Sequence, residues 1–197
     1  VGSFVGSTNS TASLVNLTVE SGTLYANARG DSVGYLGGVV GRADGSNMIH
    51  LVNKASITGD TFVHTGGVFG RVYAYDSTTM HNIENVGLVI GKENVAGIAG
   101  LCSTLRNGLE LHNYGDVEGE QFVGGICGTG PATINLSYSS NSGSISASSS
   151  NVGGLIGYIY MFNGNDVSIS DSINSGSVQG LDNVGGLIGH LDNGGNS

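Results

Sequence analysis

The sequence has little charge, a single proline and no apolar run long enough to cross a membrane. Lys and Arg together number 6, against 15 Asp and Glu, which gives 197 residues a formal net charge of −9. Nucleic acids and anionic membranes are bound through basic faces. We therefore expect no nucleic-acid partner and no membrane insertion. Because charged residues make up only 11% of the chain, surface polarity must come from Ser, Thr and Asn.

Cysteine is also scarce, and the two copies, Cys102 and Cys127, do not share a repeat position. Counted from the glycine boxes described next, Cys127 corresponds to Ala99 in the preceding repeat, and Cys102 follows Ala99 by three residues. Along a straight strand this offset is about 10 Å, too far for a disulfide. We therefore predict two free and mostly buried thiols.

Glycine, by contrast, is abundant at 36 residues, and it recurs in a short box whose clearest form is Val-Gly-Gly-Leu-Ile-Gly. The leading positions of successive boxes, at residues 2, 37, 66, 96, 124, 153 and 185, lie 28 to 35 residues apart, a period typical of stacked arrays. We therefore expect residues 1–197 to form a single repeat array. Because the chain begins inside one repeat and ends just after the last box, we interpret it as an excerpt of a longer protein. The boxes occupy residues 1–6, 37–41, 66–70, 96–100, 123–128, 152–157 and 184–189.

A second signature, Asn-x-Gly-x-Val/Ile-x-Gly/Ala, lies between the boxes, as in the stretch from Asn174 to Gly180. The first repeat has Glu20 in place of the asparagine. Glycine-rich boxes disfavour helices, whereas short alternating runs such as Val167–Ile173 favour strands. Asparagine and glycine tolerate the positive φ of turns. These patterns predict strands joined by turns.

Together the patterns predict an all-β fold, a parallel β-solenoid (β-helix) with about one coil per repeat of 28–35 residues. We expect it to be right-handed. Equivalent residues then stack about 4.8 Å apart and form apolar columns inside the coil. The three expected columns are Val39, Val68, Ile98, Ile126, Leu155 and Leu187; Val40, Phe69, Ala99, Cys127, Ile156 and Ile188; and Leu24, Ile57, Val89, Val117, Ile145 and Val178.

The asparagines of the second signature should form a ladder, because stacked amides can hydrogen-bond from layer to layer at an inward turn. We expect this column to be structural. Its members are Asn53, Asn85, Asn113, Asn141 and Asn174.

The box joined to Asn-x-Gly-x-Val-x-Gly, as in residues 174–189, resembles the GLUG repeat. This glycine-rich repeat occurs in IgA-specific metallopeptidases of Gram-positive bacteria and in bacterial surface proteins and adhesins. The resemblance covers nearly the whole chain and is strongest in the last two repeats. It implies a β-helical segment of a secreted or surface-displayed protein, and it carries no catalytic residue. The zinc motif His-Glu-x-x-His of the peptidases is absent from the sequence.

The sequence therefore favours a non-enzymatic structural or adhesive segment, extracellular or at the cell surface, that serves as a stalk, spacer or binding surface. Its expected partners are neighbouring repeats or domains of the same chain, a host protein or glycan, or further copies that associate end to end. Two alternatives remain: a β-helical accessory region of a larger secreted enzyme such as a peptidase, and a carbohydrate-binding solenoid. No catalytic or metal-binding residue is predicted.

Aromatic residues that follow the boxes are the candidate ligand contacts, because exposed rings bind sugars or partner side chains. They are Tyr73, Tyr75, Tyr158, Tyr160 and Phe162.

No cofactor is expected, although two turns rich in Asn and Asp, residues 163–166 and 192–196, have the oxygen-rich composition that calcium prefers. The sequence also contains N-glycosylation sequons at Asn9, Asn16 and Asn135. Whether they carry glycans depends on the source of the chain.

Overall fold

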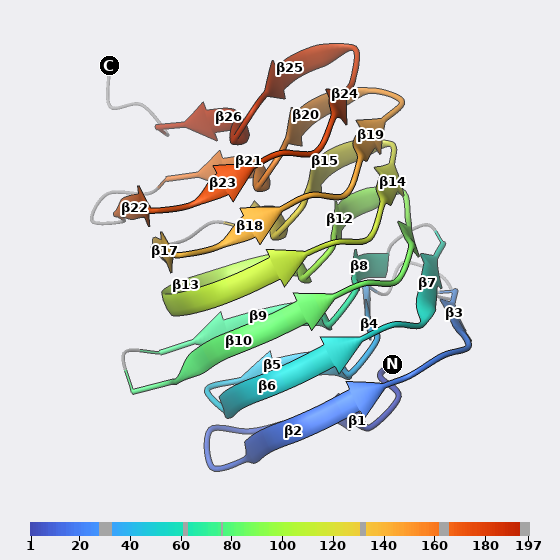
Figure 1. The fold of residues 1–197 in the computed structure, drawn as a ribbon, viewed down its shortest axis with the longest axis vertical. Coiled ribbons are helices and arrows are strands. Elements are labelled where there is room, and N and C mark those ends of the chain that lie inside the picture. The colour runs from blue at the N-terminus through green and yellow to red at the C-terminus, as the bar shows by residue number, and fades with distance from the viewer. Residues whose placement is uncertain (28–32, 61–62, 76, 131–132, 162–165, 194–197) are drawn as a thin grey trace.

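The computed structural model describes residues 1–27, 33–60, 63–75, 77–130, 133–161 and 166–193. Within these ranges every regular element is a strand. Strands of successive repeats pair in parallel and build a β-solenoid, which confirms the predicted fold (Figure 1). The coils rise from the N-terminal end at the bottom of the view to the C-terminal end at the top.

The coils contribute strands to three sheets. The first six-stranded sheet follows the Asn-x-Gly turns and contains β3 (Thr23–Ala26), β7 (Ser56–Gly59), β11 (Val89–Ile90), β14 (Val117–Gly119), β19 (Ile145–Ala147) and β24 (Val178–Gln179). The second six-stranded sheet leads into the glycine boxes and contains β4 (Gly34–Gly37), β8 (Val63–Gly66), β12 (Glu93–Ala96), β15 (Gln121–Gly124), β20 (Ser150–Gly153) and β25 (Asp182–Gly185).

The large, 14-stranded sheet has two halves, which we call the box strands and the ladder strands. The box strands leave the glycine boxes and are β1 (Val5–Ser7), β5 (Val40–Asp44), β9 (Phe69–Ala74), β16 (Cys127–Gly130), β21 (Ile156–Tyr160) and β26 (Ile188–Asp192). The ladder strands lead to the Asn-x-Gly turns and are β2 (Ser13–Val19), β6 (Asn47–Asn53), β10 (Met80–Asn85), β17 (Ile134–Ser137), β18 (Ser140–Asn141), β22 (Val167–Ser170) and β23 (Ile173–Asn174).

One strand, β13 (Ala99–Asn113), spans both halves. It pairs with box strands β9 and β16 near its start and with ladder strands β10, β17 and β18 near its end. It carries register irregularities between Cys102 and Thr104 on the β9 side and between Leu105 and Gly108 on the β17 side. Such bulges let one long strand bend around the core.

The three predicted apolar columns are confirmed in register. Val40 pairs with Phe69 and Phe69 with Ala99, and the column continues through Cys127 to Ile156 and Ile188. Ile156 is only 1% exposed. Burial fades at the ends of the array, where Phe4 and Leu187 are exposed because no coil covers them. A single coil could not bury these residues, so the stack itself is the core.

The glycine boxes mark the closest contacts between coils. A β-carbon on Gly66 would collide with backbone atoms of Phe69, Ile98 and Gly100, and one on Gly70 would meet the backbone of Leu36. Side chains cannot fit where the backbones of neighbouring coils meet, so glycine recurs at these positions.

The prediction of free cysteines is wrong: Cys102 and Cys127 form a disulfide between adjacent coils. Their Cα atoms lie 6.1 Å apart, within the range that a disulfide spans. The offset of about 10 Å assumes a straight strand. The shorter Cα–Cα distance shows that the chain curves around the core here. Both cysteine side chains are fully buried in the interior of the coil. The expectation of burial is confirmed.

Candidate functional site

The five signature asparagines lie in one column on the inner side of the turns. Each donates one side-chain N–H to the carbonyl two residues ahead, and the first four donate the other to the amide oxygen of the next asparagine. For Asn85 these bonds reach Gly87 O at 2.8 Å and Asn113 Oδ1 at 2.9 Å, while Asn53 donates to Asn85 at 2.8 Å. Asn53, Asn85, Asn113 and Asn141 are fully buried. The ladder therefore satisfies a line of polar groups that water does not reach.

In the first coil, the residue at the ladder position lies one residue earlier in the sequence than predicted. Val19, and not Glu20, pairs with Asn53 and occupies the column in the first coil. Glu20 instead accepts a hydrogen bond from Lys54 Nζ at 2.9 Å on the outside. The first coil accommodates its extra residue near Gly22, whose φ of 115° is a conformation that glycine adopts readily. An apolar side chain thus closes the lower end of the polar column.

The upper end of the ladder has no such closure among the described residues. Asn174 accepts a hydrogen bond from Asn141 at 2.8 Å and donates to Gly176 O at 3.0 Å. In the four coils below, the second N–H binds the following asparagine. The second side-chain N–H of Asn174 therefore has no ladder partner among the described residues.

Two further columns were missed by sequence reasoning, and both consist of left-handed residues. Their φ values lie between 48° and 60°; among the described residues the first column has a member in six coils and the second in four, from Asn94 onward. Their identities vary, so only the frequency of Asn, which tolerates this conformation, could have signalled them. The first column crosses the ladder strands and contains Asn16, His50, Asn82, Glu110, Tyr138 and Asp171, and the second precedes the boxes and contains Asn94, Phe122, Asn151 and Asn183.

Next to the second column, an aromatic residue that precedes one box contacts residues on either side of the following box. The Tyr35 ring stacks on His64 of the following coil with centroids 5.5 Å apart, and the Arg71 guanidinium lies 5.8 Å from the Tyr35 centroid. Burial, with the charge of Arg71 as a second cause, lowers the pKa of His64 to about 4. His64 is therefore uncharged at neutral pH, and its buried Nδ1 has no hydrogen-bond partner among the described groups.

The predicted ligand-contact aromatics do not form one surface. Tyr73 and Tyr75 contact each other on and just after β9, with centroids 4.6 Å apart, and Tyr75 is 46% exposed. Tyr158 and Tyr160 lie on β21, which β13 and β16 separate from β9.

Tyr158 packs against Phe122 at 5.1 Å and donates a hydrogen bond to Asp192 at 3.3 Å. Burial, followed by the charge of Asp192, raises its pKa. Tyr158 therefore packs along the flank of the solenoid. Phe162 lies outside the described residues.

Histidines pair with polar neighbours in adjacent coils. His112 Nδ1 lies 2.9 Å from Ser140 Oγ, and His81 Nε2 lies 2.8 Å from Glu110 Oε2. A nucleophilic serine also needs a group that orients the histidine. Glu84 is in register with His112, but the structure gives no hydrogen bond between these two residues. The pairs thus resemble cross-strand contacts on a sheet.

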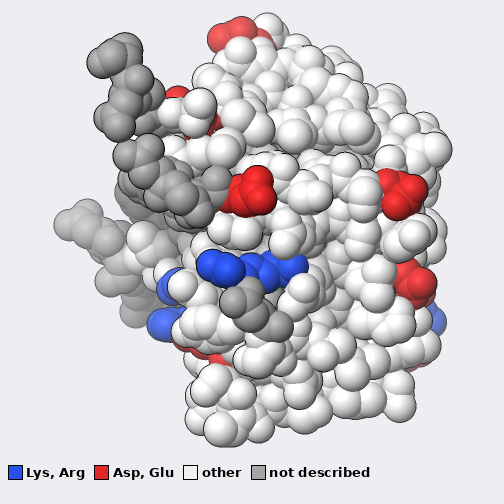
Figure 2. Space-filling view, turned by 90° about the vertical axis from the view of Figure 1, so that its left-hand side faces the viewer, with Lys and Arg blue, Asp and Glu red and all other residues white. Residues whose placement is uncertain are grey.

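The surface is sparsely charged. On the face in Figure 2 most of the described area is neither acidic nor basic. No group of three His, Cys, Asp or Glu side chains that could hold a metal ion occurs in the part of the chain that the structure describes. Of the two turns considered for calcium, residues 163–165 and 194–196 lie outside that part.

No helix in the described ranges is long and apolar enough to span a membrane. Comparisons with models of known families, with curated proteins and with solved structures give no match.

Proposed function

We propose that this chain is a non-enzymatic structural or adhesive β-solenoid segment of a secreted or cell-surface protein, in keeping with its resemblance to GLUG repeats. The observation that carries the proposal is the buried asparagine ladder, which runs through the coils from Asn53 to Asn174. Each coil depends on the next for its polar satisfaction as well as for its core. Such an array sets the distance between whatever lies at its two ends.

The disulfide between Cys102 and Cys127 supports an extracellular location, because disulfides persist in oxidising compartments. The sparsely charged composition, in which Ser, Thr and Asn supply much of the polarity, fits the same setting. The alternatives of an accessory region in a larger enzyme and of a carbohydrate-binding solenoid share this location. They differ in whether a neighbouring domain or the solenoid surface carries the activity.

A coil insertion tests the spacer role. Residues 142–174 form one repeat between register-equivalent asparagines, Asn141 and Asn174. Duplicating this segment after Asn174 should add one coil, lengthen the rod by about 4.8 Å and extend the ladder by one amide. The matched control is a duplication of residues 142–158, about half a coil, which breaks the register.

If this segment is a spacer, the full-length protein should retain activity when whole coils are added. Any change in that activity should grow with the number of added coils. Circular dichroism and small-angle scattering verify the fold and the length of each variant. Complete loss of activity after insertion of a single well-folded coil would contradict a spacer role.

A further inference from the structure

The outer face of the ladder strands carries exposed aromatic and apolar side chains in the middle coils. Tyr114 and Tyr138 are exposed there, and so is Val86, which holds the position of Tyr114 in the coil below. Phe4 and Leu187 are exposed for a different reason, because they lie at the ends of the array. Large apolar side chains that gather on one outward face indicate a binding surface.

The first column of left-handed residues makes this face unusually rich in side chains. In a regular strand, successive side chains alternate between the two faces. In β10, Met80 and Ile83 are buried, but both residues between them, His81 and Asn82, are only partly buried. The positive φ of Asn82 breaks the alternation, and the other members of its column do the same in their coils. Each of these coils therefore presents two consecutive side chains to the outside.

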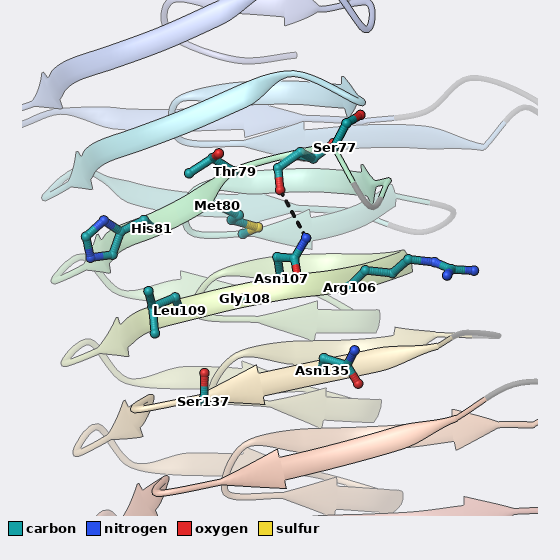
Figure 3. Close-up of a pocket in the computed structure, with 11 residues that line it drawn as sticks. Ser77, Thr79, Met80, His81, Arg106, Asn107, Gly108, Leu109, Asn135 and Ser137 are labelled. Carbon is teal, nitrogen blue, oxygen red and sulfur yellow. Dashed lines mark hydrogen bonds between the residues drawn. The ribbon is translucent and has the colours of Figure 1, made fainter.

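A cavity of about 450 Å³ opens beside these side chains at the middle of the array (Figure 3). It results from the course of β13, because the coil below passes from β9 to β10 through a turn, whereas β13 continues without one. His81, Leu109 and Ser137 line the cavity and follow one another from coil to coil (Figure 3). The hollow leaves these three residues open to a partner that approaches from outside.

The backbone of this face is not available to a partner. Strand β13 pairs with β10 on one side and with β17 and β18 on the other, so its main-chain groups are used within the sheet. A peptide cannot add here as a further strand, since that mode requires a free sheet edge. Recognition on this face therefore depends on side chains.

The charged side chains among these outward residues are acidic. Glu110 shares its column with Tyr138 and Asp171, and Glu84 lies in the coil below Glu110. Burial, followed by the charge of Glu84, raises the pKa of Tyr114, so the negative potential extends to the aromatic side chains. Lys and Arg are absent from the four stretches that form this part of the face, residues 81–84, 109–112, 137–140 and 170–173.

Tyrosine rings next to carboxylates suit a cationic side chain. A guanidinium or ammonium group packs over an aromatic ring, and its N–H groups bind carboxylates through charge-assisted hydrogen bonds. A second copy of this chain is a poor occupant, because each copy carries a net charge of −9. The same charge disfavours an acidic glycan. Charge complementarity therefore selects a basic partner.

We propose that the face defined by Glu84, Glu110, Tyr114 and Tyr138 docks a basic polypeptide segment of a partner protein. Arg or Lys side chains of the segment lie over the tyrosine rings and bind the two carboxylates. The proposal rests on the adhesive role proposed above and names the chemistry of the partner. Its test is independent of the coil insertion, which measures the spacer role alone.

Fluorescence anisotropy of a labelled ten-residue peptide in which Arg and Ser alternate, titrated with the whole chain, tests the proposal. Two control peptides carry Gln or Glu in place of Arg. We expect the Arg peptide to bind at least about tenfold more tightly than the Gln peptide, and the Glu peptide not to bind. Binding of the Arg peptide should weaken with added salt.

Two matched double variants distinguish this face from the overall negative charge of the chain. Glu84→Gln with Tyr138→Asn removes one carboxylate and one ring from the face, and asparagine tolerates the positive φ at position 138. Glu118→Gln with Tyr25→Asn removes the same groups from the first six-stranded sheet, where Tyr25 is as exposed as Tyr138, at 59%. The first pair should weaken binding of the Arg peptide about tenfold, and the second should leave it unchanged.

Circular dichroism establishes that each variant is folded. Absence of Arg-peptide binding, or equally tight binding of the Gln or Glu peptide, would overturn the proposal. Equal effects of the two double variants would also overturn it, because the net charge and not this face would then attract the peptide. Light scattering that shows an oligomer dissociated by the first pair alone would assign the face to a second copy and reject a basic partner.

Discussion

The side-chain amide of Asn85 lies directly against Gly67, so that a β-carbon on Gly67 would overlap it. The glycine at the same box position meets the ladder in this way in other coils: Gly38 faces Asn53, and Gly97 faces Asn113. The glycine box and the Asn-x-Gly turn are therefore two sides of one contact across the interior of the coil. This contact explains why both signatures recur together.

Asn85→Ala should destabilise the fold by about 3 kcal/mol. The substitution leaves the carbonyl of Gly87, an N–H of Asn53 and the amide oxygen of Asn113 without their partner in a dry interior. Chemical denaturation followed by circular dichroism measures the loss. Asn135→Ala, on the exposed face, is the control and should change stability by less than about 0.5 kcal/mol. Equal effects of the two substitutions would show that the ladder is not stabilising.

Gly67→Ala should also cost about 3 kcal/mol, because the new methyl group overlaps Asn85 and the carbonyl of Gly97. Gly186 holds the same box position in the last coil but has nothing within 4 Å of its β-carbon site. Gly186→Ala should therefore leave stability nearly unchanged. In a double-mutant cycle, Asn85→Ala should relieve part of the cost of Gly67→Ala. Additive effects would contradict a direct contact between Gly67 and Asn85.

His64 should make the fold sensitive to acid. Its pKa falls from 6.5 to about 4 on folding, chiefly through burial, so the unfolded chain binds the proton more readily. Stability should then be full above pH 6.5 and decline as the pH falls toward 4, by up to about 3 kcal/mol. His64→Phe retains a ring beside Tyr35 but cannot titrate. Denaturation curves across this pH range should differ in slope between the two proteins, and identical slopes would contradict a buried neutral histidine.

The disulfide should contribute about 3 kcal/mol, because it closes a loop with a sequence separation of 25 residues. Reducing agent should lower the denaturation midpoint of the wild type. A variant with Cys102→Ala and Cys127→Ala should be less stable and insensitive to reductant. Thiol titration of the unreduced, denatured chain checks the bond itself, and detection of two free thiols would rule it out.

The parts of the fold that were predictable from the sequence are those that repeat with the same residue type. The column from Val40 to Ile188 needs an apolar residue from each coil, and the ladder needs an asparagine from each of its coils, so both appear as repeats in the sequence. The positions of Cys102 and Val19 were missed because each depends on a local departure from the regular path, a bend in one case and an inserted residue in the other.

The cavity lined by Thr79, Asn107 and Asn135 was harder to predict, because no motif encodes it. It arises from the loop that β13 lacks, and its lining residues come from three coils with no shared signature. The short spacing of 28 residues between the leading box positions Ala96 and Gly124 was the available signal. Spacing shows that a loop is missing but not which side chains the gap exposes.

The upper end of the array should associate with another coil. Leu187 is 42% exposed, whereas Leu155, its equivalent in the coil below, is fully buried. The open position at Gly186 lies in this final repeat, close to the side-chain N–H of Asn174 that has no ladder partner among the described residues. An exposed strand edge beside an exposed slice of core favours stacking. We expect the isolated chain to self-associate end to end as its concentration rises.

Light scattering over a range of concentrations measures this association. Leu187→Lys places a charge on the open face and should favour the monomer, whereas Tyr114→Lys, at an exposed position in a middle coil, should leave association unchanged. Gly186→Ala is the more specific probe, because its methyl group is harmless in the monomer but would obstruct a coil stacked above it. A wild-type chain that stays monomeric at high concentration would mean that the residues of the final repeat act as a cap and not as a template for the next coil.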